Sequence, residues 1–164
     1  MKCEECGFVY EDVPGGEIAE RLLTFPALVR AALAAIPADR IRQRPEPATW
    51  SPLEYTCHLR DAFLAQRERA VVALVEDGPR FTRIYRDERV DLTGYDEDDV
   101  DSALAGLDVG ATLLARTYRR MTTEQMQRPC DYNLPHAGLV DLTWVGRHSV
   151  HEGEHHLLDI RRQS

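Results

Sequence analysis

Apolar side chains recur every three or four residues along four long segments, which is the period of an α-helix with one buried face. The segments cover residues 17–36, 51–76, 98–121 and 141–162. The connectors between them are rich in proline, glycine and charge, and none alternates convincingly as a strand would. Because amphipathic helices of this length bury their apolar faces against one another, we predict an all-α four-helix bundle with one crossover loop.

The start of the second segment carries the clearest local signal. Ser51 is a good N-cap, Pro52 suits the first helical position, and Glu54 completes a capping box. In the first segment Pro26 predicts a kink or a restart of the helix, with Thr24 as a cap. Gly146 and Gly153 share the apolar face of the last segment and predict a close helix contact there.

The segment between the second and third helices, residues 80–97, is polar and lacks helical period. A loop of this length in a compact domain often covers or lines a site, so we consider it a candidate lid; a disordered loop is the alternative. Its arginines could meet a carboxylate-bearing substrate, although plain surface charge is the simpler interpretation. They are Arg80, Arg83, Arg86 and Arg89.

Composition narrows the classes of partner. The chain has 164 residues, 43% of them hydrophobic, and a net charge of −8. The absence of a basic patch argues against nucleic-acid binding, and no apolar run reaches the roughly eighteen residues that a membrane span needs. The N-terminus lacks the basic start and apolar core of a signal peptide. We expect a cytoplasmic protein with a small-molecule substrate.

Four of the six histidines fall within residues 148–156. His151 and His155 are four apart on the predicted helix, so both imidazoles can approach one divalent metal ion. A third ligand has to come from elsewhere, and His58 is the best candidate. Three neutral imidazoles with open positions would make a catalytic type of site. A surface helix whose histidines bind nothing is the alternative.

Two carboxylates are candidates for catalytic work near these histidines. Glu152 follows His151 in an H-E-x-x-H string, so it could act as the base for a metal-bound water. Asp61, like Glu54, could orient His58 through its second ring nitrogen. For Glu54 and Asp61, a solvated charge on a helix is the simpler interpretation.

The first fifteen residues form an extension before the bundle, which we place at residues 16–164. Cys3 and Cys6 lie in a C-x-x-C-G turn like half of a zinc ribbon, and we predict a second metal site there. The missing ligands could be Cys57, or Cys130 with His136. A loose tail and a redox-active cysteine pair are the alternatives.

Two motifs together resemble the DinB/YfiT-like superfamily. Residues 50–54 read W-S-P-L-E and lead to His58, and residues 151–160 read H-E-G-E-H-H-L-L-D-I. The resemblance covers residues 16–162 and implies a four-helix bundle with a metal bound by three histidines. The metal is typically zinc, sometimes nickel or manganese, and members are often dimers. The implied ligands are His58, His151 and His155.

The resemblance also implies an activity. Members of known function resemble thiol S-transferases that use a low-molecular-weight thiol such as mycothiol or bacillithiol, including a mycothiol-dependent maleylpyruvate isomerase. Our leading hypothesis is therefore a metal-dependent S-transferase or isomerase. A metal-dependent hydrolase that uses metal-bound water, and a non-enzymatic metal or redox sensor, are the alternatives. The C-x-x-C-G extension is outside the family pattern.

Overall fold

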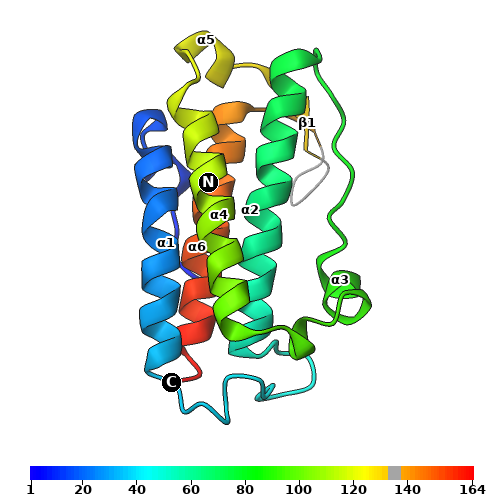
Figure 1. Cartoon of the computed structure of the whole chain (residues 1–164). Coiled ribbons are helices and arrows are strands. Elements are labelled where there is room, and N and C mark those ends of the chain that lie inside the picture. Colours follow the sequence, from blue (N-terminus) through cyan, green and yellow to red (C-terminus); the bar gives the residue numbers. More distant parts are fainter. Residues whose placement is uncertain (133–137) are drawn as a thin grey trace.

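The computed structural model describes residues 1–132 and 138–164, and its main feature is a bundle of four long helices (Figure 1). The predicted four-helix bundle is confirmed. Its helices are α1 (Ile18–Ala34), α2 (Pro52–Val75), α4 (Val100–Arg119) and α6 (Leu142–Arg161). Shorter elements join them: η1 (Tyr10–Asp12), η2 (Gly15–Glu17), α3 (Arg86–Leu92), η3 (Tyr95–Glu97), α5 (Thr123–Met126), β1 (Pro129–Asp131) and β2 (Leu139–Asp141).

The crossover between α2 and α4 sets the topology. It runs back along the length of the bundle, so α2 and α4 point the same way (Figure 1). Both α2 and α1 contact α4 and α6, and α6 runs antiparallel to α2. The two helices that carry most of the histidines, α2 and α6, therefore lie side by side.

All four long helices contribute to one apolar core. Ile18 and Leu22 of α1 pack among buried leucines of α4 and with Val150 and Ile160 of α6. Gly153 faces the Phe25 ring so closely that an added Cβ would overlap it. The predicted close contact at this face of α6 is confirmed.

Most local signals act as predicted. The Ser51 hydroxyl accepts from the backbone N–H of Glu54, and the Glu54 carboxylate accepts from that of Ser51, which completes the capping box. Helix α1 continues through Pro26, so the helix does not restart there. Thr24 is not a cap, because its hydroxyl donates to the Arg21 carbonyl within the helix. A proline removes only one backbone hydrogen bond, and the packing of Phe25 and Val29 maintains the helix around it.

Two connectors contain more structure than their patterns indicate. The crossover contains α3 and η3, and Val90 and Tyr95 anchor it against Leu53 of α2. The connector after α5 contains a short antiparallel pair, β1 with β2, which three-residue strands are too short to reveal by alternation. His136 lies outside the described residues.

The N-terminal extension packs on the bundle and is not a loose tail. Phe8, Tyr10 and Val13 are buried in the main core, and η1 and η2 contact α6. The extension therefore covers a face of α6 that the other helices leave open. None of the described helices is long and apolar enough to cross a membrane.

Candidate metal centre

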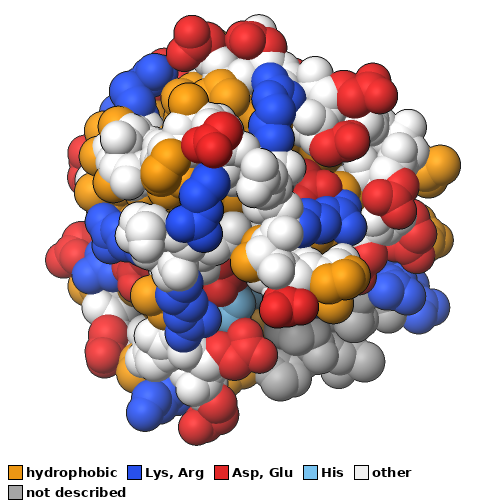
Figure 2. All heavy atoms as spheres, turned by 90° about the horizontal axis from the view of Figure 1, so that it is seen from below, with side chains coloured by type: hydrophobic (Ala, Val, Ile, Leu, Met, Phe, Trp, Pro, Cys, Tyr) orange, Lys and Arg blue, Asp and Glu red, His pale blue; other side chains and the backbone are white. Residues whose placement is uncertain are grey.

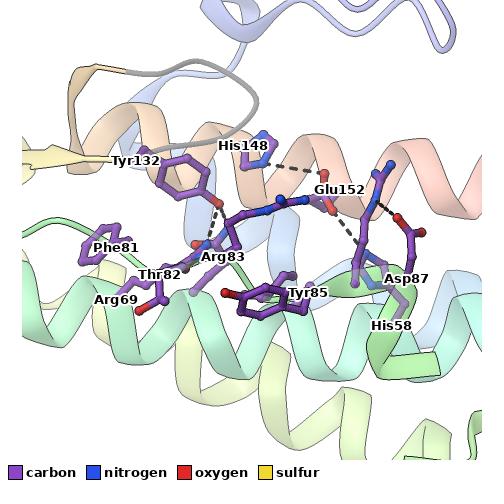
Figure 3. A pocket seen from close by; sticks show the side chains of 14 residues that line it. His58, Arg69, Phe81, Thr82, Arg83, Tyr85, Asp87, Tyr132, His148 and Glu152 are labelled. Carbon is purple, nitrogen blue, oxygen red and sulfur yellow. Dashed lines mark hydrogen bonds and ion pairs between the residues drawn. The ribbon is translucent and has the colours of Figure 1, made fainter. Parts of the chain in front are cut away.

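His58 lies on α2 and faces α6. Its side chain is 1% exposed, and its Nε2 atom lies 3.3 Å from Oε2 of Glu152, the contact drawn in Figure 3. Burial lowers the pKa of His58, with only partial opposition from the Glu152 hydrogen bond. At neutral pH the imidazole is therefore neutral, which is the form that binds a metal.

Glu152 lies at the centre of a cluster of imidazoles. On α6, His148 and His156 lie one turn before and after it, each with Nε2 3.7 Å from a carboxylate oxygen of Glu152. Burial alone would raise the pKa of Glu152, but the hydrogen bonds of His156 and His58 hold it well below its ordinary value. One ligand atom each of His58, Glu152 and His156 lie within 4.8 Å of one another.

His156 supplies the positive charge of this cluster. Its Nδ1 atom lies 3.0 Å from Oδ2 of Asp159. Burial opposes protonation, but the hydrogen bonds to Asp159 and Glu152 outweigh it and raise the pKa of His156 to about 9. A protonated imidazole thus balances two carboxylates in a buried place, which is a role that a divalent cation could also take.

A cavity of about 290 Å³ opens beside His58, His148 and Glu152. Residues 81–87 of the crossover line its other side (Figure 3). Within it, Tyr85 is the one described non-glycine residue with positive φ, at 49°. Backbone strain of this kind is typical of functional sites.

Polar side chains other than the histidines and Glu152 also line the cavity. The Tyr132 hydroxyl accepts a hydrogen bond from Arg69 Nη1 at 3.0 Å and another from Gln66 Nε2. Oε1 of Gln66 is buried and has no hydrogen-bond partner among the described residues. Arg83 and Arg86 of the crossover also line the cavity. Together these groups offer cations and one acceptor to a bound molecule.

The predicted histidine triad is divided between two clusters. His151 and His155 share a group with Cys3 and Cys6, whereas His58 is grouped with Glu152 and His156; His151 also lies in a group with His148 and Glu152. Successive side chains on an α-helix are turned by about 100°, so His151 also meets the N-terminal extension, while its Nδ1 still lies 3.8 Å from Oε1 of Glu152. The residues of α6 that lie nearest His58 of α2 are Glu152 and His156, again four apart.

His148 is a site residue that the sequence reasoning did not select as a ligand. Its Nδ1 lies 2.8 Å from the Tyr10 hydroxyl, and its ring stacks on Trp144 with centroids 5.0 Å apart. The available signal was the repeat of His148, Glu152 and His156 at intervals of four. This repeat is not visible when only histidines are considered, because its middle member is a glutamate.

The two carboxylates proposed to orient His58 have other partners. Glu54 accepts from Arg44 Nε at 2.9 Å, besides its capping bond. Asp61 accepts from the Tyr95 hydroxyl at 2.7 Å and also pairs with Arg89, both in the crossover. Neither carboxylate is hydrogen-bonded to His58, because the arginines and Tyr95 lie closer. Asp61 instead fastens the crossover to α2.

The cysteines also separate into two kinds. Cys57 and Cys130 are buried, and burial raises their pKa values to about 12 and about 11. Cys57 contacts Asp98 and takes no part in the group around Cys3 and Cys6. Burial also raises the pKa of Cys6, although hydrogen bonds from the backbone N–H groups of Phe8 and of Cys6 itself lower it in part.

Comparisons with known proteins agree with this architecture. YfiT from Bacillus subtilis, described as a probable metal-dependent hydrolase with an unusual four-helix bundle topology, superposes with a TM-score of 0.78 at 18% sequence identity. The match covers 91% of this chain and 86% of that one. No curated protein matches the sequence significantly. Residues 21–160 match the DinB superfamily, and the chain therefore belongs to that family.

Proposed function

We propose that this protein is a metal-dependent enzyme acting on a small anionic substrate, with a divalent cation held by His58, Glu152 and His156. The observation that carries the proposal is the convergence of these three donors, from α2 and α6, at the wall of the cavity. Two imidazoles and a carboxylate are donors that zinc and related ions accept.

The protonation states fit such a site. His58 is neutral and Glu152 is ionised at neutral pH, as ligation requires. His156 would have to release its proton, and the incoming cation would replace the charge that this proton supplies. Asp159, at 3.0 Å from His156 Nδ1, can hold the ring in place as the acceptor beside a metal-bound histidine commonly does.

A bound divalent ion lowers the pKa of a coordinated water or thiol and so supplies a nucleophile near neutral pH. The chain's own residues bind and orient the substrate. Arg69 is held by Tyr132 and its guanidinium lies over the Tyr132 and Phe81 rings, so it presents a fixed positive charge to an anion. The buried Gln66 acceptor selects a substrate that brings a hydrogen-bond donor.

The nucleophile has two candidates. A thiol is the one that the sequence motifs favour, which would make the protein an S-transferase or isomerase using a cofactor such as mycothiol. Water is the second candidate, supported by the description of the structural neighbour YfiT as a probable metal-dependent hydrolase. The cavity of about 290 Å³ is at the lower end of ligand pockets, roughly 300–1,000 Å³, which also suits one small substrate.

The test compares Glu152→Gln with Glu154→Gln in protein reconstituted with zinc, manganese or nickel. Glu154 lies two residues further along α6 and pairs with Arg21 instead. Loss of an outer-shell partner alone typically costs roughly 10–100-fold, so we expect Glu152→Gln to lose more than that in turnover while Glu154→Gln keeps wild-type activity.

Substrates in this experiment are carboxylate-bearing esters and electrophiles, each with and without a low-molecular-weight thiol. Turnover that requires the thiol supports a transferase, and turnover in water alone supports a hydrolase. Equal activity of the two glutamate variants, or activity independent of added metal, would remove the proposed centre.

A further inference from the structure

A second cluster of metal-binding side chains lies on the neighbouring face of α6, apart from the cavity. We propose that Cys3, Cys6, His151 and His155 form a closed, structural zinc site that fixes the N-terminal extension to α6. The two sulfurs and one nitrogen from each imidazole all lie within 4.8 Å of one another. Cys3 Sγ lies 3.8 Å from His155 Nδ1.

The spacing is close to what tetrahedral zinc requires. With Zn–S near 2.3 Å and Zn–N near 2.0–2.1 Å, ligand atoms around one ion lie roughly 3.3–3.8 Å apart. Separations of 4.8 Å or less reach this range after a contraction of roughly 1–1.5 Å at most. Two thiolates and two neutral imidazoles complete the coordination, so no position is left for a substrate.

The extension is built to present its two cysteines. Cys3 N–H donates to the Phe8 carbonyl at 2.8 Å, and Gly7 N–H donates to the Cys3 carbonyl at 2.9 Å. Gly7 has a φ of +76°, a conformation that glycine adopts without strain and that closes this tight turn. Both cysteines are free thiols, and the buried Phe8 fastens the turn to the bundle.

On α6 the two histidines show what a metal would satisfy. Both ring nitrogens of His151 are buried, and neither has a hydrogen-bond partner among the described residues. The Phe8 and Tyr10 rings pack against the His151 ring, with centroids 5.3 and 5.4 Å away. A buried polar atom without a partner is costly, and a bond to zinc would remove that cost for one nitrogen.

His155 is oriented for ligation from its other side. While Nδ1 faces Cys3, Nε2 lies 3.2 Å from Oε2 of Glu5, within the same C-x-x-C turn. A carboxylate on the second nitrogen of a histidine is the usual support for a zinc ligand. On binding, Cys3 and Cys6 each release one proton and the imidazoles bind through lone pairs, so the zinc centre is electrically neutral.

The experiment titrates metal-free protein, kept reduced, with cobalt(II) alone. Thiolate ligands give sulfur-to-cobalt charge-transfer absorption in the near ultraviolet, and tetrahedral geometry gives intense visible bands. We expect both signals in the wild type. Cys6→Ser should weaken the charge-transfer band markedly and His151→Gln should lose the visible intensity, whereas the control Cys57→Ser should keep both.

A further variant separates this site from the cavity site. His58→Ala should keep the cobalt–thiolate signal even if the proposed enzymatic metal is lost, so failure of one proposal is distinguishable from failure of the other. X-ray absorption of the zinc-loaded wild type needs no variant to fold, and it should show sulfur neighbours: two for each ion at this site, and fewer on average when the cavity site is filled as well. The inference is overturned if zinc has only nitrogen and oxygen neighbours, or if His151→Gln leaves the cobalt spectrum unchanged.

Discussion

Glu152 contacts four imidazoles, those of His58, His148, His151 and His156, with nitrogen–oxygen distances between 3.3 and 3.8 Å. The charge of this one carboxylate therefore controls the protonation of its surroundings. Its strongest effect is on His156, which it keeps protonated together with Asp159. The stability of the metal-free protein should consequently depend on pH.

The sign follows from the shifted pKa values. Protonation of His156 stabilises the fold fully below its ordinary pKa of 6.5, and this contribution is lost as pH rises through about 9. Ionisation of Glu152 stabilises the fold above its ordinary pKa of 4.5 and is lost as pH falls through its lowered value. The pair therefore contributes most between about pH 4.5 and 6.5.

Thermal unfolding with a chelator present checks this expectation. We expect His156→Gln to lower the melting temperature most near pH 6, and the difference from the wild type to shrink by pH 9. His155 lies on the neighbouring face, and the His155→Gln variant controls for general loss of an imidazole. A difference between wild type and His156→Gln that stays constant with pH would exclude the ion-paired cluster as its cause.

Single residues also show where sequence reasoning reaches its limit. The spacing of four on α6 was visible, but two polar stripes share it, 148-152-156 and 151-155. Which of the two stripes faces α2 depends on which segment of the chain packs over the other stripe. The apolar run Phe8-Val9-Tyr10 in the extension was the available signal, because such residues need a partner surface.

At the scale of elements, periodicity was sufficient for the four long helices and the capping box, since these depend on local sequence. It was insufficient for β1 and β2, which are three residues long, and for α3, whose seven residues are anchored by one buried valine. Short elements are set by their tertiary contacts, and sequence periodicity does not report those.

The contact between α1 and α6 leads to a prediction about packing. A Cβ at position 153 would overlap the Phe25 ring, so Gly153→Ala should destabilise the protein by about 1–3 kcal/mol despite the better helix propensity of alanine. Gly16 is the control, because an added Cβ there would meet nothing within 4 Å. Gly16→Ala should change stability little.

Chemical denaturation of both variants measures the effect as a free energy of unfolding. If Gly153→Ala proves as stable as the wild type, the close approach of α1 to α6 is not a determinant of stability.

For the whole molecule, the extension is part of the fold and not an appendage. Phe8 is 6% exposed and packs edge-on against Tyr10, with ring centroids 5.2 Å apart. Figure 2 shows acidic and basic side chains interleaved over the end of the molecule seen there, with little histidine surface visible.

Phe8→Ala should therefore cost about 3 kcal/mol of unfolding free energy, as for other buried phenylalanines. Tyr85→Ala is the control, since Tyr85 is 52% exposed and its loss should change stability little. Denaturant unfolding of metal-free protein separates packing from metal binding. A Phe8→Ala variant as stable as the control would mean that residues 1–9 detach freely in solution.

The pairing of the extension with α6 has a consequence for biosynthesis. Cys3 and His155 are 152 positions apart, so all the residues between them have to leave the ribosome before the two can meet. Until then the early-made cysteines stay solvent-exposed on the nascent polypeptide, open to oxidation or to capture by the wrong ion. Metal loading thus belongs among the last events of maturation, after the bundle has closed.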